Sequence, residues 1–128
     1  MKGYITNIEK ETLENNNFRK VLYTAKNSQL VVMSIAPGDD IGSEVHELDQ
    51  FIRIEAGTAK AVLDGVESKL PAEHAVIIPA GVEHNIINTG NEPLKLYSIY
   101  SPPEHKDGTI YPTKDDEKEE HFDGQTTE

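Results

Sequence analysis

Three side chains that can bind a metal or move a proton lie close together between residues 44 and 57. Glu44, His46 and Gln50 have the same parity as Ile52 and Ile54, and a β-strand sends alternate side chains to opposite faces. One extended strand would therefore place a carboxylate, an imidazole and an amide on the face that the isoleucines bury. Buried polar groups are costly unless they are paired or bound to a metal, so a metal ion is the leading explanation.

A second polar stretch, at residues 79–88, supplies a partner for this group. It begins with a Pro-Ala-Gly turn and continues as an extended run in which His84, Ile86 and Asn88 share one face. An antiparallel arrangement of the two stretches would bring His84 against His46. The sequence therefore predicts a polar site built from two segments that are far apart along the chain.

The elements that must position these side chains are short β-strands. About eight to ten apolar or alternating runs are separated by Gly, Pro, Asn and Asp, without the pattern of a long amphipathic helix. Asp64-Gly65 lies between two such runs and predicts a type I′ hairpin. Residues 3–8 are expected to form a further short strand, and residues 9–17 a loop or one helical turn. The pattern predicts an all-β sandwich or barrel.

Length, charge and composition narrow the class of protein. A chain of 128 residues is long enough for one domain with a core. A net charge of -11 argues against nucleic acid and anionic membranes as partners. The absence of cysteine excludes disulfides, thiol catalysis and cysteine-bound metals. The N-terminus lacks the apolar run of a secretory signal, so a cytoplasmic location is expected.

The composition changes after residue 103. We expect a β-barrel domain over residues 1–103, with its motif-bearing core at about 30–100, followed by an acidic, largely irregular tail at 104–128. Residues 113–128 carry almost no apolar side chains, and such a run cannot offset its own ordering entropy by burial. A short helix near residues 114–120 is the regular element expected there.

The stretch around Glu44 resembles the first of the two motifs of the cupin superfamily. His46 matches the second histidine of that motif, and Gly57 matches its closing glycine. Glu44 stands where the first histidine is usual, and Gln50 stands where a glutamate is usual. The second departure removes the general base that the family usually has at this position, because an amide does not titrate usefully.

The stretch at residues 79–88 resembles the second cupin motif at every fixed position, namely Pro79, Gly81, His84 and Asn88. The glycine that usually stands six residues before this proline is Glu73 here. The resemblance covers about residues 30–100 and looks like that of a small single-domain cupin. It implies a jelly-roll β-barrel with a metal site inside, near one mouth.

The resemblance implies a divalent transition metal held by Glu44, His46 and His84. Two imidazoles and one carboxylate are the donor set of the facial triad, which suits non-haem Fe(II); Mn, Ni and Zn are the other candidates. Gln50 is either a fourth ligand through its amide oxygen or a neighbouring group that orients water. His105 is the candidate catalytic acid or base, provided that its loop folds back over the mouth.

Three functions remain open from the sequence. The first is a metal-dependent enzyme that acts on a small polar molecule by dioxygenase or sugar isomerase or epimerase chemistry. The second is a non-catalytic cupin module that binds a small molecule or a metal, which the missing glutamate favours. The third is a metal-free structural barrel whose polar groups hydrogen-bond one another. Under each of them the edge strands of an open jelly roll predict a homodimer.

Overall fold

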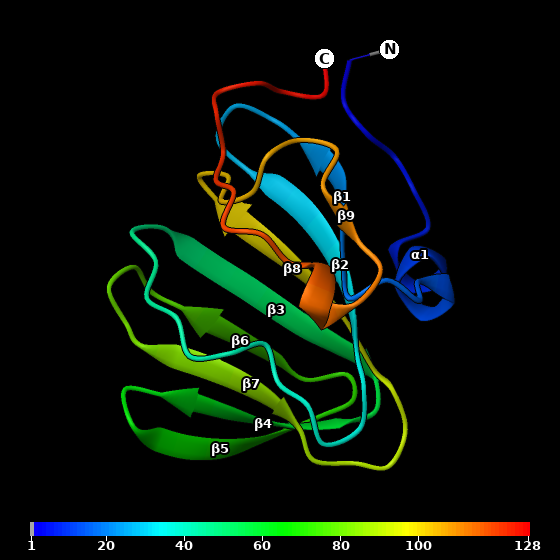
Figure 1. Cartoon of the computed structure of the whole chain (residues 1–128), viewed down its shortest axis with the longest axis vertical. Helices are drawn as coiled ribbons and strands as arrows, with labels where there is room; N and C mark the ends of the chain where they lie inside the picture. Colours follow the sequence, from blue (N-terminus) through cyan, green and yellow to red (C-terminus); the bar gives the residue numbers. More distant parts are fainter. Residues whose placement is uncertain (1) are drawn as a thin grey trace.

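The larger of two antiparallel sheets contains six strands (Figure 1). The structure is a computed structural model and describes residues 2–128. The strands of this sheet are β1 (Arg19–Thr24), β2 (Gln29–Ile35), β3 (Asp49–Ala56), β6 (Ala75–Ile78), β8 (Leu94–Ser101) and β9 (Ile110–Tyr111). They lie in the order β6-β3-β8-β2-β1-β9. The all-β jelly-roll prediction is confirmed by this arrangement together with the smaller sheet.

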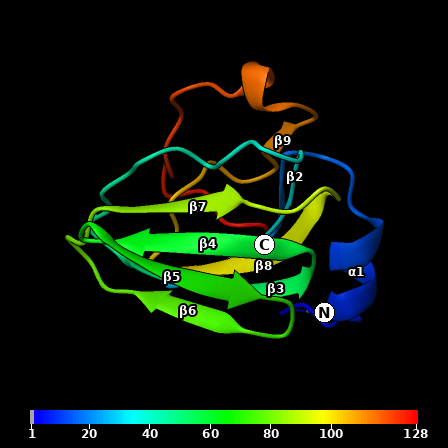
Figure 2. The same cartoon turned by 90° about the horizontal axis from the view of Figure 1, so that it is seen from below.

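The smaller sheet consists of β4 (Thr58–Leu63), β5 (Val66–Pro71) and β7 (His84–Asn88), in the order β5-β4-β7. Figure 2 shows these strands side by side, with residues 36–48 running along the far edge of β7. That loop is hydrogen-bonded to β7, because the amide of Ile41 donates to the carbonyl of Ile86 at 3.0 Å. The loop therefore brings the first polar stretch to the strand that carries the second.

The hairpin between β4 and β5 forms as the sequence predicts. Leu63 lies opposite Val66 in the register. Asp64 and Gly65 between them have φ angles of 50° and 80°. Two positive φ values in succession are the signature of the type I′ turn, which matches the twist of the flanking strands.

The core lies between the two sheets and changes character along β3 and β8. Alternate residues of both strands are buried. Toward one end Ile54 lies opposite Leu96, both with no exposed surface. Toward the other end Gln50 lies opposite Tyr100. Ser98 is the buried residue between Leu96 and Tyr100 on β8. The barrel interior is therefore apolar at one end and polar at the other.

The strand predicted for residues 3–8 does not form, so that prediction is wrong: residues 3–7 are irregular, and helix α1 (Ile8–Glu14) begins at the last predicted residue. Its N-cap is Asn7, whose side chain accepts a hydrogen bond from the amide of Lys10 at 3.1 Å. Such a cap satisfies one of the free amides of the first turn. The helix packs against β8, β3 and β2. Within residues 2–128 no helix has the length and apolar character needed to cross a membrane.

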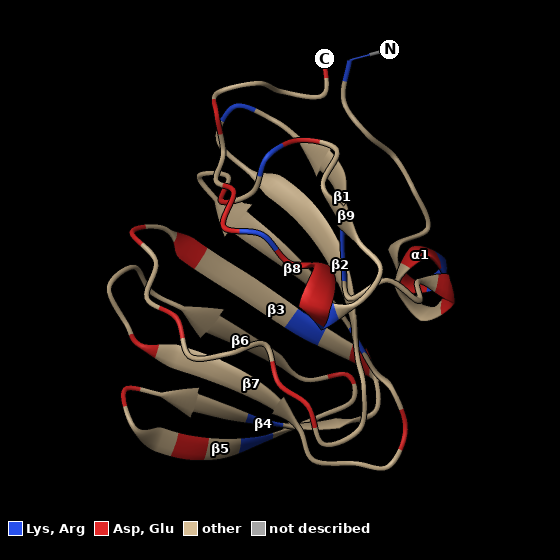
Figure 3. Cartoon of the chain, in the orientation of Figure 1, with Lys and Arg blue, Asp and Glu red and all other residues tan. Residues whose placement is uncertain are grey.

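The C-terminal segment returns along the larger sheet and then across the end of the barrel (Figure 1). Strand β9 pairs with β1, and a 3-10 helix, η1 (Lys114–Asp116), follows it. Near the end of the chain the amide of Thr127 donates to the carbonyl of Thr24 at 2.9 Å. Figure 3 shows acidic residues spread over this segment and over several loops, with lysines and arginines scattered among them.

Candidate metal centre

Glu44 and His46 reach the barrel interior from a loop and not from a strand. Strand β3 begins at Asp49, so the prediction of one extended strand over residues 44–54 is wrong. The loop is held instead by a β-bridge in which Glu44 and His84 exchange both backbone hydrogen bonds, each at 2.9 Å. Gln50, by contrast, lies on the buried face of β3 as its parity predicts.

The two histidines meet at the polar end of the barrel, as the antiparallel arrangement predicts. The centroids of the His46 and His84 rings are 5.1 Å apart. Nδ1 of His84 lies 3.0 Å from the carbonyl oxygen of Val82. Because a carbonyl can only accept, Nδ1 donates this hydrogen bond, and Nε2 is the ring nitrogen that remains to bind a metal. This is how an outer partner commonly orients a histidine that binds a metal through its other nitrogen.

Glu44 and His46 form a hydrogen-bonded pair, with Nε2 of His46 3.0 Å from Oε2 of Glu44. Burial alone would lower the pKa of His46, but the hydrogen bond and charge of Glu44 raise it above its ordinary value. Burial likewise opposes ionisation of Glu44, and the contact with His46 holds the pKa of that carboxyl below its ordinary value. The pair therefore favours a charged imidazole beside a charged carboxylate.

Gln50 presents an unpaired oxygen to the interior. Its side chain is 3% exposed, and Nε2 donates to Oγ of Ser98 at 3.0 Å. Among the described residues, Oε1 of Gln50 has no hydrogen-bond partner. Buried polar atoms without a partner are rare and costly. A metal ion or a water molecule at this end of the barrel would satisfy it.

His105 and Tyr100 form an aromatic wall beside the two histidines. The Tyr100 ring packs edge-on against His105 at 4.9 Å and against His46 at 6.1 Å between centroids. Burial raises the pKa of Tyr100 to about 12. Burial, followed by the charge of Arg19, lowers the pKa of His105 to about 2. His105 is thus a neutral imidazole at ordinary pH, and its catalytic role stays a prediction.

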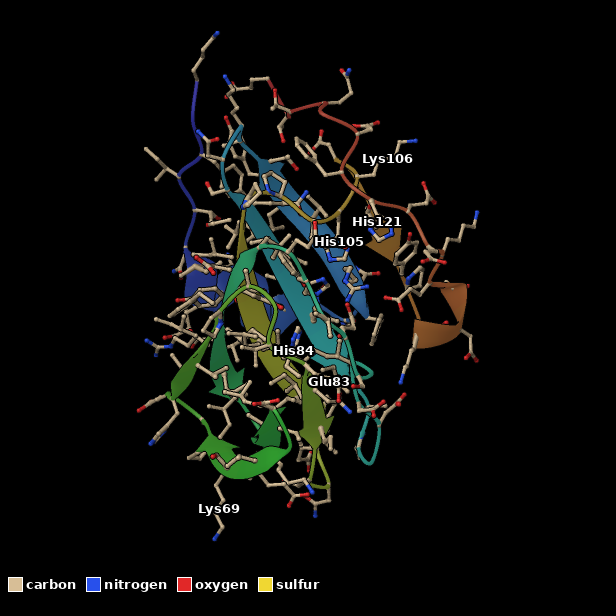
Figure 4. The ribbon with its side chains drawn as sticks, turned by 90° about the vertical axis from the view of Figure 1, so that its left-hand side faces the viewer. Lys69, Glu83, His84, His105, Lys106 and His121 are labelled. Atoms are coloured by element: carbon tan, nitrogen blue, oxygen red, sulfur yellow. The ribbon has the colours of Figure 1, made fainter. Side chains whose placement is uncertain are left out.

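The loop that carries His105 folds over the mouth of the barrel. The buried side chain of Gln29 anchors it, accepting from the amide of His105 at 3.0 Å and donating to the His105 carbonyl at 2.7 Å. Figure 4 shows His105 and His121 beside the C-terminal segment, with His84 at the start of β7 farther from it. The loop therefore closes one side of the polar end.

Two site residues were missed by sequence reasoning. Oε2 of Glu104 lies 3.6 Å from Nδ1 of His46, and Oε1 of Glu104 lies 2.8 Å from Nδ1 of His121. The Arg19 side chain is buried and forms an ion pair with Glu117. The signal for Arg19 was its parity with the buried Val21 on one strand. Glu104 had no signal beyond its place beside His105.

The donor set fits a divalent transition metal, but in this structure the candidate ligands do not converge on one point. Within residues 2–128, no three His, Asp or Glu side chains stand in a cluster that could hold a metal as they lie. The hydrogen bond between Glu44 and His46 occupies Nε2 of His46 and one of the two carboxylate oxygens of Glu44. Binding therefore requires that this pair separate, while the fixed Nε2 of His84 and the free Oε1 of Gln50 already suit it.

Comparisons with known proteins agree with this architecture. The model of the cupin domain family matches residues 31–100. The chain is 45% identical over 122 residues to the uncharacterized protein YrkC of Bacillus subtilis, covering 90% of this chain and 66% of the relative. The chain thus spans slightly less than two thirds of that relative's length.

Solved structures give the same result for the fold. A Bacillus halodurans protein of known crystal structure has a TM-score of 0.88 and 43% identity, covering 90% of this chain and 92% of its own. A predicted oxalate decarboxylase from Thermotoga maritima has a TM-score of 0.57 and 23% identity, covering 60% and 68%. The second likeness shows the fold alone.

Proposed function

This chain belongs to the cupin family, and on that premise we propose that it binds a divalent transition metal and acts on a small polar molecule. The ligands are Glu44, His46 and His84, and the amide oxygen of Gln50 is the fourth donor. Fe, Mn, Ni and Zn all suit imidazole with oxygen donors, so the donor set does not select one of them.

The observation that carries this proposal is the unpaired Oε1 of Gln50 at the polar end of the barrel. Its amide nitrogen donates to Ser98, and its oxygen has no partner among the described residues. Two histidines and a carboxylate lie at the same end, with the His46 and His84 rings 5.1 Å apart. A metal ion accepts lone pairs and would satisfy all of these atoms together. Hydrogen bonds among the same side chains leave Oε1 of Gln50 without a partner.

The side chains around this site are suited to binding and orienting a substrate rather than to transferring protons. When bound, the metal supplies a Lewis acid that polarises oxygen atoms of the substrate or a centre that activates O₂. The Tyr100 hydroxyl keeps its proton to a pKa of about 12 and can donate a hydrogen bond. His105, with its pKa lowered to about 2, is available as a neutral group. Dioxygenase and sugar isomerase or epimerase chemistry remain the two candidate reactions.

A non-catalytic module that binds a small molecule or a metal is the second candidate. It is favoured by the acid–base properties of the site. The amide of Gln50 does not titrate, and His105 with a pKa of about 2 is a weak base. A general base works best when its pKa lies near the working pH. Turnover of substrate by the metal-loaded protein separates the two candidates.

The test is metal content measured by elemental analysis on protein purified without an affinity tag. Wild type is compared with His46→Ala and His84→Ala, and with His74→Ala as the matched control, because His74 is exposed. We expect near-stoichiometric metal in wild type and in the control, and its loss in the other two variants.

Reconstitution with Fe(II), Mn(II), Ni(II) and Zn(II) completes the test. Absence of binding for all four metals contradicts the proposal, as does full binding by both His46→Ala and His84→Ala. Circular dichroism of each variant establishes that a loss of metal is not a loss of fold.

A further inference from the structure

The C-terminal segment lines an open cavity at the mouth of the barrel. Figure 2 shows this segment on the same side of the smaller sheet as residues 36–48, and Figure 4 shows His105 beside it. The cavity has a volume of about 480 Å³. Residues that line it from the barrel and from the segment include Arg19, Glu44, Glu104, Lys114, Glu117 and His121.

Arg19 is a buried cation in the wall of this cavity. The residue is 2% exposed, although a guanidinium carries five N–H donors. Among the described residues its ion pair is with Glu117 alone, and one further nitrogen lies 4.0 Å from the sulfur of Met33. Its Nε has no hydrogen-bond partner in the same part of the chain. The donors of this buried charge are thus only partly satisfied, which is costly unless an anion fills the site.

Glu117 reaches Arg19 from a segment that is otherwise solvent-exposed. The side chain of Glu117 is 32% exposed, and that of Glu119 nearby is 92% exposed. The segment is also held by polar contacts at its surface, such as the one between His121 and Glu104. Leaving the buried guanidinium without an anion would be strongly destabilising, so Glu117 can leave Arg19 only when another anion takes its place. The carboxylate of Glu117 is therefore an internal anion that an external one can replace.

We propose that Arg19 is the anion-binding residue of this mouth, and that the site takes a small molecule with a carboxylate group that displaces Glu117. A carboxylate matches the planar fork of a guanidinium through two parallel hydrogen bonds. Phosphate also fits the fork, but at neutral pH it carries a second charge on the same group that faces Arg19, and the nearby Lys114 is already paired with Asp39 and Asp40. The local charge therefore favours a singly charged carboxylate group.

Anion binding at Arg19 does not depend on the proposed metal site. The role of the bound carboxylate compound as a substrate rests on the proposed function. The charge of Arg19 acts on Glu44 as well as on Glu117. A molecule whose carboxylate binds Arg19 would extend toward Glu44 and His46. Arg19 would then fix one end of the substrate, while the metal ligands face the other.

The experiment is calorimetric titration of the full chain, freed of metal with a chelator, with malonate. Malonamide is the neutral control ligand. The variants are Glu117→Gln, which removes the internal charge, and Glu119→Gln, which removes a charge from the same segment without touching Arg19. A site filled by its internal anion most of the time binds an external one with reduced apparent affinity, so we expect Glu117→Gln to bind malonate at least about tenfold more tightly than wild type.

Glu119→Gln should bind malonate as wild type does, and malonamide should not bind. Adding Arg19→Lys to Glu117→Gln should weaken malonate binding at least about tenfold, because the two-point geometry is lost. Equal affinities of Glu117→Gln and wild type overturn the inference. An equal gain in Glu119→Gln, or no binding by any variant, also overturns it.

Metal content is measured separately on the same proteins. Metal binding without malonate binding overturns this inference and leaves the proposed metal site intact. Malonate binding at Arg19 without metal binding supports this inference and contradicts the proposed metal site. The Glu117→Gln and Glu119→Gln comparison stays decisive even where substitution of the buried Arg19 prevents folding.

Discussion

The backbone amide of Gly81 donates a hydrogen bond to the carbonyl oxygen of His46 at 2.8 Å. This bond joins the turn that precedes β7 to the loop that carries the first polar stretch. Gly81 has a φ of 85°, a backbone conformation that residues with a Cβ rarely adopt. The turn therefore positions His46 through its backbone, in addition to leading into His84.

Replacement of Gly81 by alanine should destabilise the protein and weaken metal binding at the proposed site. No heavy atom lies within 4 Å of the added Cβ, so the cost is backbone strain and not a clash. We expect the free energy of unfolding in urea to fall by about 1–2 kcal/mol. Gly81→Asn should lose less, because asparagine tolerates this region better. An unchanged free energy of unfolding in Gly81→Ala would contradict the expectation that alanine is strained at this position.

Asn88 should have a structural role. Its Nδ2 donates to the carbonyls of Ile35 and Glu92, both at 2.9 Å, and the residue is 1% exposed. Asn88→Ala leaves these carbonyls short of a donor, so we expect a loss of about 2–4 kcal/mol in urea unfolding. The exposed neighbour Thr89 provides the control, Thr89→Ala, with a change of less than about 0.5 kcal/mol. Loss of metal from a folded Asn88→Ala protein would argue for a direct role at the site.

Local patterns predicted those parts of the fold that local chemistry determines. Asp64-Gly65 formed its hairpin because the turn type needs two positive φ angles. Gln50 is buried because it keeps the parity of Ile52 and Ile54 on β3. Residues 3–8 failed as a strand because Asn7 caps a helix that begins at Ile8, a competing local signal that the apolar residues concealed.

Pairings between distant segments were beyond the sequence pattern. Glu44 and His46 lie at the site because their loop bonds to β7, not because they continue β3. Arg19 and Glu117 are brought together by the return of the C-terminal segment, which no spacing along the chain encodes. The candidate ligands could be named from residue types and motif positions, but the proposed anion site at Arg19 required the fold.

Low pH should loosen the attachment of η1 to the loop at residues 36–48. The hydrogen bonds from Lys114 and then from Asn85 hold the pKa of the Asp40 carboxyl below its ordinary 3.8. A lowered folded-state pKa stabilises the protein fully above the unfolded value, and this contribution is lost as pH falls through the folded value. Urea unfolding from roughly pH 6 to pH 3 should therefore show a steeper loss in wild type than in Asp40→Asn. Parallel pH profiles for the two proteins would exclude this contribution.

Substitution of Gln50 by glutamate should make the stability of the protein depend on metal at the proposed site. Without metal, a carboxylate in this buried site resists ionisation, so its folded-state pKa is raised and stability falls as pH rises. We expect metal-free Gln50→Glu to lose about 1–3 kcal/mol in urea unfolding at alkaline pH, and saturating Zn(II) to restore it. A second carboxylate among the donors should also tighten Zn(II) binding at least about tenfold in competition with a chelator. Gln50→Leu, which removes the oxygen, should weaken it. Equal Zn(II) affinity in wild type, Gln50→Glu and Gln50→Leu would place the metal away from Gln50 and leave the unpaired Oε1 to water.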